Sequence, residues 1–480
     1  MNSVRQEIQN VDLAMSESRK PKVSANSRRD FIRRSAAGIG AAALSGCAGP
    51  GASTASAITT PEPLLAPMSP ENPLAAPPME VVRIGFVGVG GMGTAHVKNL
   101  LQIPGARIQA VCDIREEHAL RASKLITDAG QPKPTLYTRG EFDFLRLCEE
   151  EDLDLVYTAT PWRYHVPVCV AAMENGKHAA TEVPASYTLE GCWKLVNTAE
   201  AYGKHCVMME NCNYDRPELM AFNMIRKGLL GEVLHGECGY LHDLREIKFS
   251  DNGEGLWRRE HSKVRNGNLY PTHGLGPIAQ CMDINRGDYF DYIVSMSSPS
   301  RGLQDYAKEH FPPDSPMRKE TYALGDVNVS LIKTINGRTI YLSHDTNLPR
   351  PYSRINMVQG TKGLFSGYPN RVYIEGVSKP HTWDTWETYF DTYDHPLWKA
   401  ESKEEGRAGH GGMDYLEDAR LIKCLLEGQP TDMNVYDAAA ISAVCALSEM
   451  SVANGSLPVR FPDFTGGRWK EWEPLGLVTL

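Results

Sequence analysis

The feature that most constrains the fold is a glycine-rich turn in the stretch VVRIGFVGVGGMGTAHVKNLL, which begins at Val81. Its glycines follow the pattern Gly-x-Gly-x-x-Gly at Gly88, Gly90 and Gly93. In a dinucleotide-binding fold the first glycine allows a tight turn, the second lets the backbone approach the pyrophosphate, and the third lets helix and strand pack closely. The stretch therefore predicts a buried strand, a phosphate-binding turn and a helix.

A carboxylate at the end of the next predicted strand supports this interpretation. The run RIQAVCD ends in Asp113, twenty residues after Gly93. An acidic side chain at this distance can bind the ribose hydroxyls of the adenosine half. Because a carboxylate repels a 2′-phosphate, Asp113 favours NAD over NADP, and the nearby Arg115 weakens that preference.

Strands and helices alternate throughout residues 81–213, which predicts an α/β fold with an N-terminal Rossmann domain on a doubly wound parallel sheet. Further strands are expected in LDLVYTAT, HAATEVP and HCVMMENCNY. The residues after these strands should face the nicotinamide half of the cofactor: Thr160, Pro161, Trp162, Arg163, Tyr164, His165, Glu182, Val183, Pro184 and Asn211.

Residues 214–480 predict a C-terminal α+β substrate-binding domain on an open, mainly antiparallel sheet. Strands are expected in EVLHGECGYLHD, YIVSMSS, VNVSLIKT, TIYLSHDT, RINMVQGT and RVYIEG. Helices within residues 412–455 should pack back on the first domain. Since one face of such a sheet can pack on helices while the other stays free, this sheet is a candidate surface for a homo-oligomer.

Residues 1–47 have the order of an export signal. The stretch SRRDFIRRSAAGIGAAALSGC, starting at Ser27, has paired arginines, a short weakly apolar run and a small-residue ending. It is typical of a twin-arginine (Tat) signal, and the ending LSGC resembles a lipobox that would make Cys47 a lipid anchor. The Pro/Ala-rich residues 48–80 are expected to be a linker. A periplasmic or cell-envelope location follows, with a disordered basic tail as the alternative.

Charge and cysteine content narrow the range of partners. A formal net charge of -9 argues against nucleic acid or an anionic membrane surface as partner. The eleven cysteines include no CxxC pair, and several lie inside apolar runs. Buried free thiols are therefore expected rather than disulfides or a metal site, which suits folding in a reducing cytoplasm before export.

One loop of the second domain has residue types that suit proton transfer. In RNGNLYPTHGLGPIAQC, a Gly/Asn/Pro-rich loop places Tyr270 and His273 just ahead of a helix expected to start near Gly274. Histidine is the side chain most ready to move a proton near neutral pH. Taken alone, His273 is better explained as a helix-capping or core histidine. No pair of carboxylates, which a conventional glycosidase needs, stands out in the motifs expected to line the cleft.

Taken together, the fingerprint, a Thr-Pro-x-x-x-His turn and a Glu-x-Pro turn resemble the Gfo/Idh/MocA oxidoreductases over nearly the whole chain after Val81. That family usually has Glu-Lys-Pro, with the lysine near the hydroxyl that is oxidised, whereas this chain has Glu182-Val183-Pro184. Net dehydrogenation is therefore a poorer fit. The stretches TPWRYHVPVC, TEVPA, MENCNY, GECGYLHDLR, WRREHSKVRNGNLYPTHGLGPIAQCMDINRGD and GHGGMDYLEDARL are similar to glycoside hydrolase family 109, a branch typified by alpha-N-acetylgalactosaminidase.

The resemblance implies the site residues. With the fingerprint glycines, cofactor contacts are expected at Gly88, Gly90, Met92, Gly93, Asp113, Trp162, Arg163, Tyr164, His165, Glu182, Val183, Asn211 and Tyr270. Sugar contacts are implied at Tyr240, Arg259, Tyr270, Pro271, Thr272, His273 and Tyr352. For Tyr240, Arg259 and Tyr352 the sequence alone would favour packing or surface roles.

The resemblance also implies hydrolysis without net oxidation. Hydride moves from C3 of the sugar to NAD, a base removes the acidified C2 proton, the glycosidic oxygen leaves C1, water adds, and the hydride returns. His273 is the expected base, with Tyr270 positioning or sharing the proton and Tyr352 binding the sugar or assisting the leaving group. A cofactor restored in every turnover explains why an exported protein would fold around NAD before leaving the cytoplasm.

Two other functions stay open. A Gfo/Idh/MocA-type NAD-dependent sugar oxidoreductase would leave a keto sugar or a reduced acceptor, whereas a glycosidase would cleave an aryl glycoside without added NAD. A noncatalytic, surface-anchored protein that binds carbohydrate and keeps NAD as a structural element would show affinity without turnover.

Overall fold

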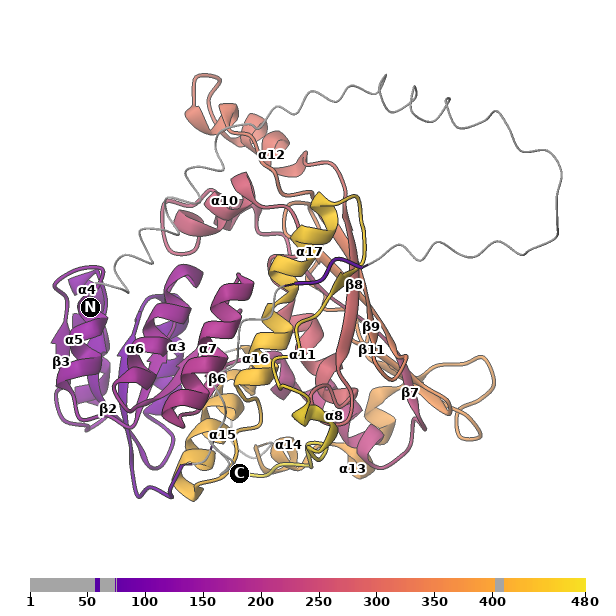
Figure 1. Cartoon of the computed structure of the whole chain (residues 1–480), viewed down its shortest axis with the longest axis horizontal. Helices are drawn as coiled ribbons and strands as arrows, with labels where there is room; N and C mark the ends of the chain where they lie inside the picture. Colours follow the sequence, from indigo (N-terminus) through magenta and orange to yellow (C-terminus); the bar gives the residue numbers. More distant parts are fainter. Residues whose placement is uncertain (1–56, 61–73, 75, 402–409) are drawn as a thin grey trace. The chain divides into compact units, whose positions relative to one another are not determined.

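The computed structural model describes residues 57–60, 74, 76–401 and 410–480. These residues form two sheets with helices packed against them (Figure 1). The expected export signal, with Cys47, and much of the expected linker lie outside the described residues. Described residues near the linker contact the folded protein: Ile58 forms a bridge with Val459, and Ala76 is buried. The described parts of the expected linker therefore make contacts with the folded protein.

The first sheet confirms the predicted doubly wound fold. Its six strands have the order β3-β2-β1-β4-β5-β6 and are all parallel. The strands are β1 Val82–Val87, β2 Ala106–Cys112, β3 Thr135–Tyr137, β4 Leu155–Thr158, β5 His178–Thr181 and β6 Cys206–Met208. The connecting helices are α3 Gly91–Leu100, α4 Glu116–Asp128, α5 Asp143–Glu150, α6 His165–Glu174 and α7 Leu189–Tyr202. The strand order reverses between β1 and β4, where such sheets bind ligands.

The strands of this sheet are apolar on both faces because helices cover both faces. In β1 the side chains of Val82, Ile84 and Phe86 are fully buried. Phe86 stacks on Tyr157 of β4, with ring centroids 4.8 Å apart. This core fixes the carboxyl ends of the central strands, which carry the predicted cofactor residues.

The second sheet has nine strands in the order β14-β13-β12-β11-β7-β10-β9-β8-β15. Its pairs are antiparallel except β7 with β10, which is parallel, as expected for a mainly antiparallel sheet. The strands are β7 Val233–Leu241, β8 Phe290–Ser297, β9 Val327–Thr334, β10 Thr339–Asp345, β11 Met357–Gly360, β12 Gly363–Ser366, β13 Arg371–Ile374, β14 Asp384–Thr385 and β15 Val459–Arg460. The sequence did not predict β12, β14 and β15, because strands of two to four residues carry too little alternation.

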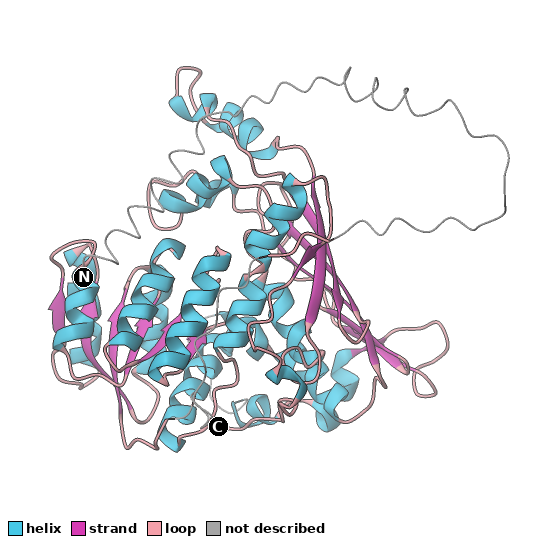
Figure 2. Cartoon of the chain, viewed as in Figure 1, coloured by secondary structure: helices cyan, strands magenta, loops and turns pink. Residues whose placement is uncertain are grey.

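The described helices after residue 214 are α8 Arg216–Arg226, α9 Arg245–Lys248, α10 Gly255–Val264, α11 Thr272–Cys281, α12 Gly302–His310, α13 Phe390–Tyr393, α14 Pro396–Glu401, α15 Met413–Glu427, α16 Val435–Ser442 and α17 Val444–Ala453. Helices α8, α11 and α17 pack on one side of this second sheet (Figure 2). Helix α11 packs very closely on β7, since a Cβ added to Gly274 would lie 2.5 Å from the backbone nitrogen of Gly239. This approach places the start of α11 beside the carboxyl half of β7.

Helices α15 and α16 connect the two parts of the fold, whereas α17, also within the predicted residues 412–455, packs on β8 of the second sheet. Asp418 of α15 contacts His96 of α3, and α16 packs against α7. Helices α16 and α17 together, Val435–Ala453, are apolar and long enough to cross a membrane, but most of this stretch is buried inside the protein. They are core helices. The ten cysteines among the described residues are all buried and free, as predicted.

Candidate active site

The turn after β1 has the geometry that its three glycines predict. Gly88 adopts a φ of +86°, which favours glycine. A Cβ on Gly93 would lie 1.9 Å from the carbonyl oxygen of Gly88, so only glycine allows α3 to start this close to β1. A Cβ on Gly90 would meet nothing within 4 Å, which leaves open space beside its backbone. The turn can therefore accept a phosphate group at the N-terminus of α3.

Asp113 lies at the end of β2, beside this turn. Its Oδ2 accepts a hydrogen bond from the backbone nitrogen of Val89 at 2.9 Å, and its Oδ1 accepts one from that of Arg115 at 2.9 Å. These bonds direct the carboxylate to the side of the turn where the adenosine ribose of a dinucleotide lies. The glycine turn and Asp113 together fit NAD.

The residues after β4 form the short 3-10 helix η1, Trp162–Tyr164. Arg163 pairs with Glu141, and the Tyr164 hydroxyl also contacts Glu141. The ring nitrogens of His165 both contact the backbone. Nδ1 lies 2.8 Å from the carbonyl oxygen of Pro184, and Nε2 lies 2.8 Å from that of Thr160. Burial lowers the pKa of this histidine. The ring thus connects the turns after β4 and β5, and an NAD contact at His165 stays a prediction.

Glu182, after β5, belongs to a buried network. Its Oε1 lies 2.9 Å from Nε2 of His96, whose Nδ1 lies 2.9 Å from Oδ2 of Asp418. Burial opposes charge on His96, but Asp418 and Glu182 raise its pKa well above the ordinary value. Burial likewise opposes charge on Glu182, yet the His96 hydrogen bond lowers its pKa. Glu182 is thus held as a carboxylate at the nicotinamide end of the sheet.

Two further predicted cofactor residues lie next to this network. Val183 is buried, so the position of the missing lysine is apolar. After β6, Asn211 donates a hydrogen bond through Nδ2 to Oδ1 of Asp414 at 2.7 Å. The carboxyl ends of β4, β5 and β6 thus bring Trp162, Glu182, Val183 and Asn211 to one edge of the sheet, as predicted.

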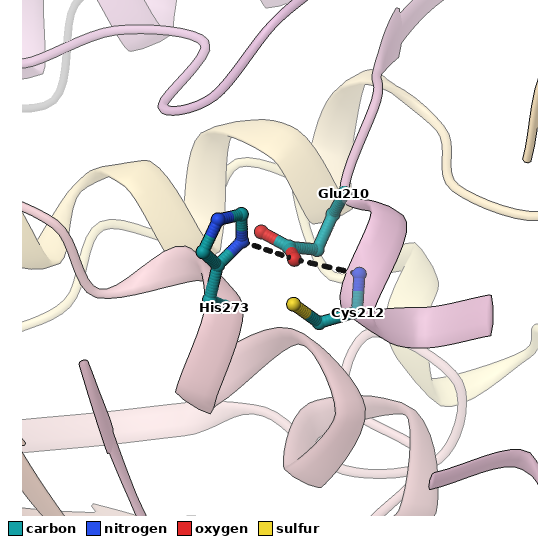
Figure 3. A group of neighbouring side chains, drawn as sticks. All are labelled: Glu210, Cys212 and His273. Carbon is teal, nitrogen blue, oxygen red and sulfur yellow. Dashed lines mark hydrogen bonds and ion pairs between the residues drawn. The ribbon is translucent and has the colours of Figure 1, made fainter. Parts of the chain in front are cut away.

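His273 lies in the first turn of α11, which begins at Thr272 rather than near Gly274. Its Nδ1 is 2.7 Å from Oε1 of Glu210, and its Nε2 is 3.4 Å from the hydroxyl of Tyr270. Figure 3 shows the Glu210 carboxylate between the imidazole and the backbone nitrogen of Cys212, which donates to Oε1 at 3.1 Å. An ionised Glu210 accepts the Nδ1 proton and leaves Nε2 as the basic nitrogen.

Glu210 was not among the predicted site residues. It lies in the stretch MENCNY, directly before Asn211 and after a predicted strand, so its position at a strand end was a usable signal. Its contact with His273 was not predictable, because 63 residues separate the two in the chain. One carboxylate, that of Glu210, thus contacts the histidine directly.

Aromatic rings surround His273. The Tyr240 ring lies 4.5 Å from that of Tyr270 and 5.4 Å from that of His273, between centroids. Tyr352, which is partly exposed, lies 6.1 Å from Tyr240. The structure thus brings together Tyr240, Tyr270, His273 and Tyr352, with Pro271 and Thr272 in the same segment. His242, whose Nδ1 is 3.0 Å from the Tyr240 hydroxyl, joins them without having been predicted.

The arginine at this site is Arg258 rather than Arg259. The Arg258 guanidinium lies 4.9 Å from the Tyr270 ring centroid and 5.1 Å from that of Trp162, and its side chain is buried. Arg259 points elsewhere, with Nε 3.3 Å from Glu320 and its guanidinium 5.3 Å from the Phe249 ring. Adjacent residues on α10 project in different directions, so a shift of one position separates a site residue from a structural one.

Burial determines the protonation state of Tyr270. Burial raises the pKa of the Tyr270 hydroxyl well above its ordinary value, although Arg258 acts in the opposite direction. The hydroxyl therefore stays protonated at neutral pH and is a proton donor rather than a base. A neutral tyrosine beside the basic Nε2 of His273 can share or pass a proton.

Comparisons with known proteins agree with both halves of the fold. Residues 82–210 match the family described as "Oxidoreductase family, NAD-binding Rossmann fold", and residues 214–471 match "Glycosyl hydrolase 109, C-terminal domain". A "Glycosyl hydrolase family 109 protein" of Shewanella sp. (strain W3-18-1) is 50% identical over 84% of this chain and 90% of that protein. An "Alpha-N-acetylgalactosaminidase" of Shewanella oneidensis is 49% identical over the same shares, 84% and 90%.

Solved structures share the fold at low sequence identity. Levoglucosan dehydrogenase in complex with NADH and L-sorbose has a TM-score of 0.62 at 20% identity, covering 80% of this chain and 100% of that one. An oxidoreductase domain protein from Kribbella flavida has a TM-score of 0.62 at 18% identity, covering 80% and 100%. These similarities show the two-part architecture.

Proposed function

From the premise that this chain belongs to glycosyl hydrolase family 109, and is a glycoside hydrolase with an NAD-binding domain, we propose that it cleaves N-acetylgalactosaminide-like glycosides without net oxidation. The alpha-N-acetylgalactosaminidase relative supports that substrate class. The observation that carries the proposal is the contact between Glu210 and His273, 2.7 Å long, beside the edge of the NAD-binding sheet. It supplies a base oriented for proton abstraction next to the place where the nicotinamide binds.

NAD fits the strand ends of the first sheet. The glycine turn would bind the pyrophosphate, Asp113 the adenosine ribose, and Trp162, Glu182 and Asn211 would line the nicotinamide end. The bound cofactor would supply a reversible hydride acceptor at C3 of the sugar, and oxidation there acidifies the C2 hydrogen. Every other task falls to side chains of the chain itself.

His273 would remove the C2 proton through Nε2. Glu210 accepts the Nδ1 hydrogen, so its negative charge stabilises the imidazolium that forms. Elimination then expels the glycosidic oxygen from C1. Tyr270 or Tyr352 can give it a proton, because burial raises the pKa of both phenols and both therefore hold their protons at neutral pH. Water then adds its hydroxyl group at C1 and gives its remaining proton to the tyrosine that protonated the leaving group, and the imidazolium returns a proton to C2.

Neighbouring side chains would orient the sugar. The Tyr240 ring lies 5.4 Å from that of His273 and 6.1 Å from that of Tyr352, between centroids, so both tyrosines are placed to contact a sugar bound at His273. Arg258 would bind a hydroxyl or acetamido oxygen, because it is a buried cation at the rim of the aromatic cluster. Arg259 remains a weaker candidate for this role.

Export and assembly form part of the same proposal. The twin-arginine stretch supports export through the Tat machinery to the periplasm or cell envelope, and the LSGC ending supports a lipid anchor at Cys47. The outer face of the second sheet supports a homo-oligomer, since Met296 and Leu331 are 57% and 56% exposed there. Apolar side chains on a sheet face are a usual contact between subunits.

The His273→Ala variant tests the assignment of the base. Turnover of an aryl N-acetylgalactosaminide in D2O should place deuterium at C2 of the sugar with the native protein. The variant should lose both the exchange and the cleavage while retaining its NAD. Retained C2 exchange would reject His273 as the base, and an oxidised sugar as the final product of the native protein would favour a sugar oxidoreductase instead.

A further inference from the structure

Cys212 has no part in the proposed reaction, yet it lies beside the two residues that carry it. One donor atom each from Glu210, Cys212 and His273 lies within 4.8 Å of the other two. Figure 3 shows the thiol beneath the Glu210 carboxylate and facing the imidazole. A nitrogen, an oxygen and a sulfur donor thus converge at one point.

Hydrogen bonds inside the protein do not use this donor set fully. Glu210 and Cys212 are both 1% exposed. Although buried, Oε2 of Glu210 has no hydrogen-bond partner among the described residues. The thiol of Cys212 donates to Oδ1 of Asn211 at 3.4 Å, and a thiol is only a weak hydrogen-bond donor. A carboxylate oxygen without a partner, beside a thiol, is an arrangement that a cation would satisfy.

The donor types select the class of cation. Thiolate, imidazole and carboxylate together are the ligands of Zn²⁺ and similar thiophilic divalent metals, whereas Mg²⁺ and Ca²⁺ prefer oxygen alone. Three protein ligands would leave a fourth position for water. The ligands also come from fixed elements, since Cys212 lies in the 3-10 helix η2, Asn211–Tyr214, and His273 in α11.

We propose that Glu210, Cys212 and His273 form a binding site for a thiophilic divalent cation of the Zn²⁺ class, and that the bound cation stops turnover. On binding, the Cys212 thiol loses its proton to solvent and a sulfur–metal bond forms. The cation takes the place of the hydrogen on Nδ1 of His273, and that hydrogen moves to Nε2. An Nε2 that carries hydrogen cannot accept the C2 proton, so the same histidine is either a metal ligand or a base.

The inhibition of turnover rests on the proposed function, whereas the binding of the cation does not. Binding and inhibition are therefore measured by two separate readouts. The holoenzyme is titrated with Co²⁺, and thiolate-to-cobalt charge-transfer absorption is followed in parallel with the rate of glycoside cleavage. We expect saturable absorption and a matching loss of rate, reversed by a chelator. In Cys212→Ser, cobalt binding should weaken by more than about 10-fold. Cys281→Ser alters a different buried cysteine, the last residue of α11. It is the matched control and should bind cobalt like the native protein.

Three results would overturn parts of the proposal. Absence of charge-transfer absorption in the native protein would remove the site. Absorption that persists in Cys212→Ser, or disappears in Cys281→Ser, would place the metal elsewhere. Full cobalt occupancy with an unchanged cleavage rate would keep the site but reject its effect on His273. If the native protein cleaves no glycoside at all, the proposed function fails, while the absorption titration still tests the site.

Discussion

At the scale of single residues, the site depends on one carboxylate that serves a histidine. Glu210 is buried, and its Oε1 accepts hydrogen bonds from both His273 and the backbone of Cys212. The ring is therefore fixed in the tautomer that leaves Nε2 free. A residue that acts through another in this way is a positioning residue.

The Glu210→Gln variant tests this role. The amide matches the carboxylate in size but removes the charge that stabilises the imidazolium, so kcat should fall about 100-fold with KM little changed. Steady-state kinetics on an aryl glycoside, with the NAD content of the variant measured alongside, would show this. A rise in KM at unchanged kcat would contradict the assignment.

Arg258 and Arg259 form a matched pair, because they are neighbours on α10 with different surroundings. Arg258→Gln should lower kcat/KM by at least about 10-fold, since a buried charge-assisted contact to the sugar would be lost. Arg259→Gln, which gives up the ion pair with Glu320, should change kcat/KM less than about 3-fold. The reverse order of effects would restore Arg259 as the sugar contact.

Glu417 of α15 is a buried carboxyl group whose two oxygens have no hydrogen-bond partner among the described residues. Burial raises its pKa well above the ordinary value, and Asp418 adds to the shift. The folded protein therefore favours the protonated form. The contribution of Glu417 to the free energy of unfolding is fully present below about pH 4 and is lost as the pH rises through the raised pKa.

Glu417→Gln should remove this pH dependence. At pH 8 the free energy of unfolding of the variant should exceed that of the native protein by about 1–3 kcal/mol. At this pH the native carboxyl group must either keep its proton or carry a charge while buried, whereas the amide is neutral. Near pH 4 the difference should be small. Urea unfolding at both values would measure it, and equal differences at pH 4 and pH 8 would show that Glu417 does not titrate in this range.

At the scale of elements, the glycines in the turn between β1 and α3 have separate roles, one in packing and one in ligand binding. Gly93 touches the backbone of Gly88, whereas Gly90 faces open space. The two glycines thus have different tasks within one motif. Gly274 likewise has a packing role. It allows α11 to approach β7 closely, and this approach places His273 beside Tyr240.

Substitution by alanine should distinguish the two tasks. Gly93→Ala should lower the melting temperature and the NAD content together, because its Cβ would collide with the Gly88 carbonyl. Gly90→Ala should keep the melting temperature but reduce bound NAD, since its methyl group would occupy the space for the pyrophosphate. Thermal unfolding and quantification of the released nucleotide measure both. Full NAD content in Gly90→Ala would show that the cofactor does not approach this backbone.

At the scale of the whole molecule, local sequence patterns predicted the architecture well. They predicted the contacts between segments that are distant in the chain less well. The parallel sheet, Asp113 and the cluster of Tyr240, Tyr270 and Tyr352 follow from strand ends and motif resemblance. Glu210 and Arg258 did not, because their roles depend on the packing of α10 and α11 against the strand ends. The hydrogen bonds of the His165 ring to two backbone carbonyls were likewise not predicted, because they join turns that are separate in the chain.

The central claim is that a retained NAD is reduced and restored within each turnover. Purified protein, with no NAD added, should release NAD on denaturation and should cleave aryl glycosides in D2O with deuterium appearing at C2 of the free sugar. Many turnovers per bound nucleotide, with an unoxidised sugar as product, are the predicted result. Full activity in protein that contains no dinucleotide, or a keto sugar as the final product, would contradict the claim.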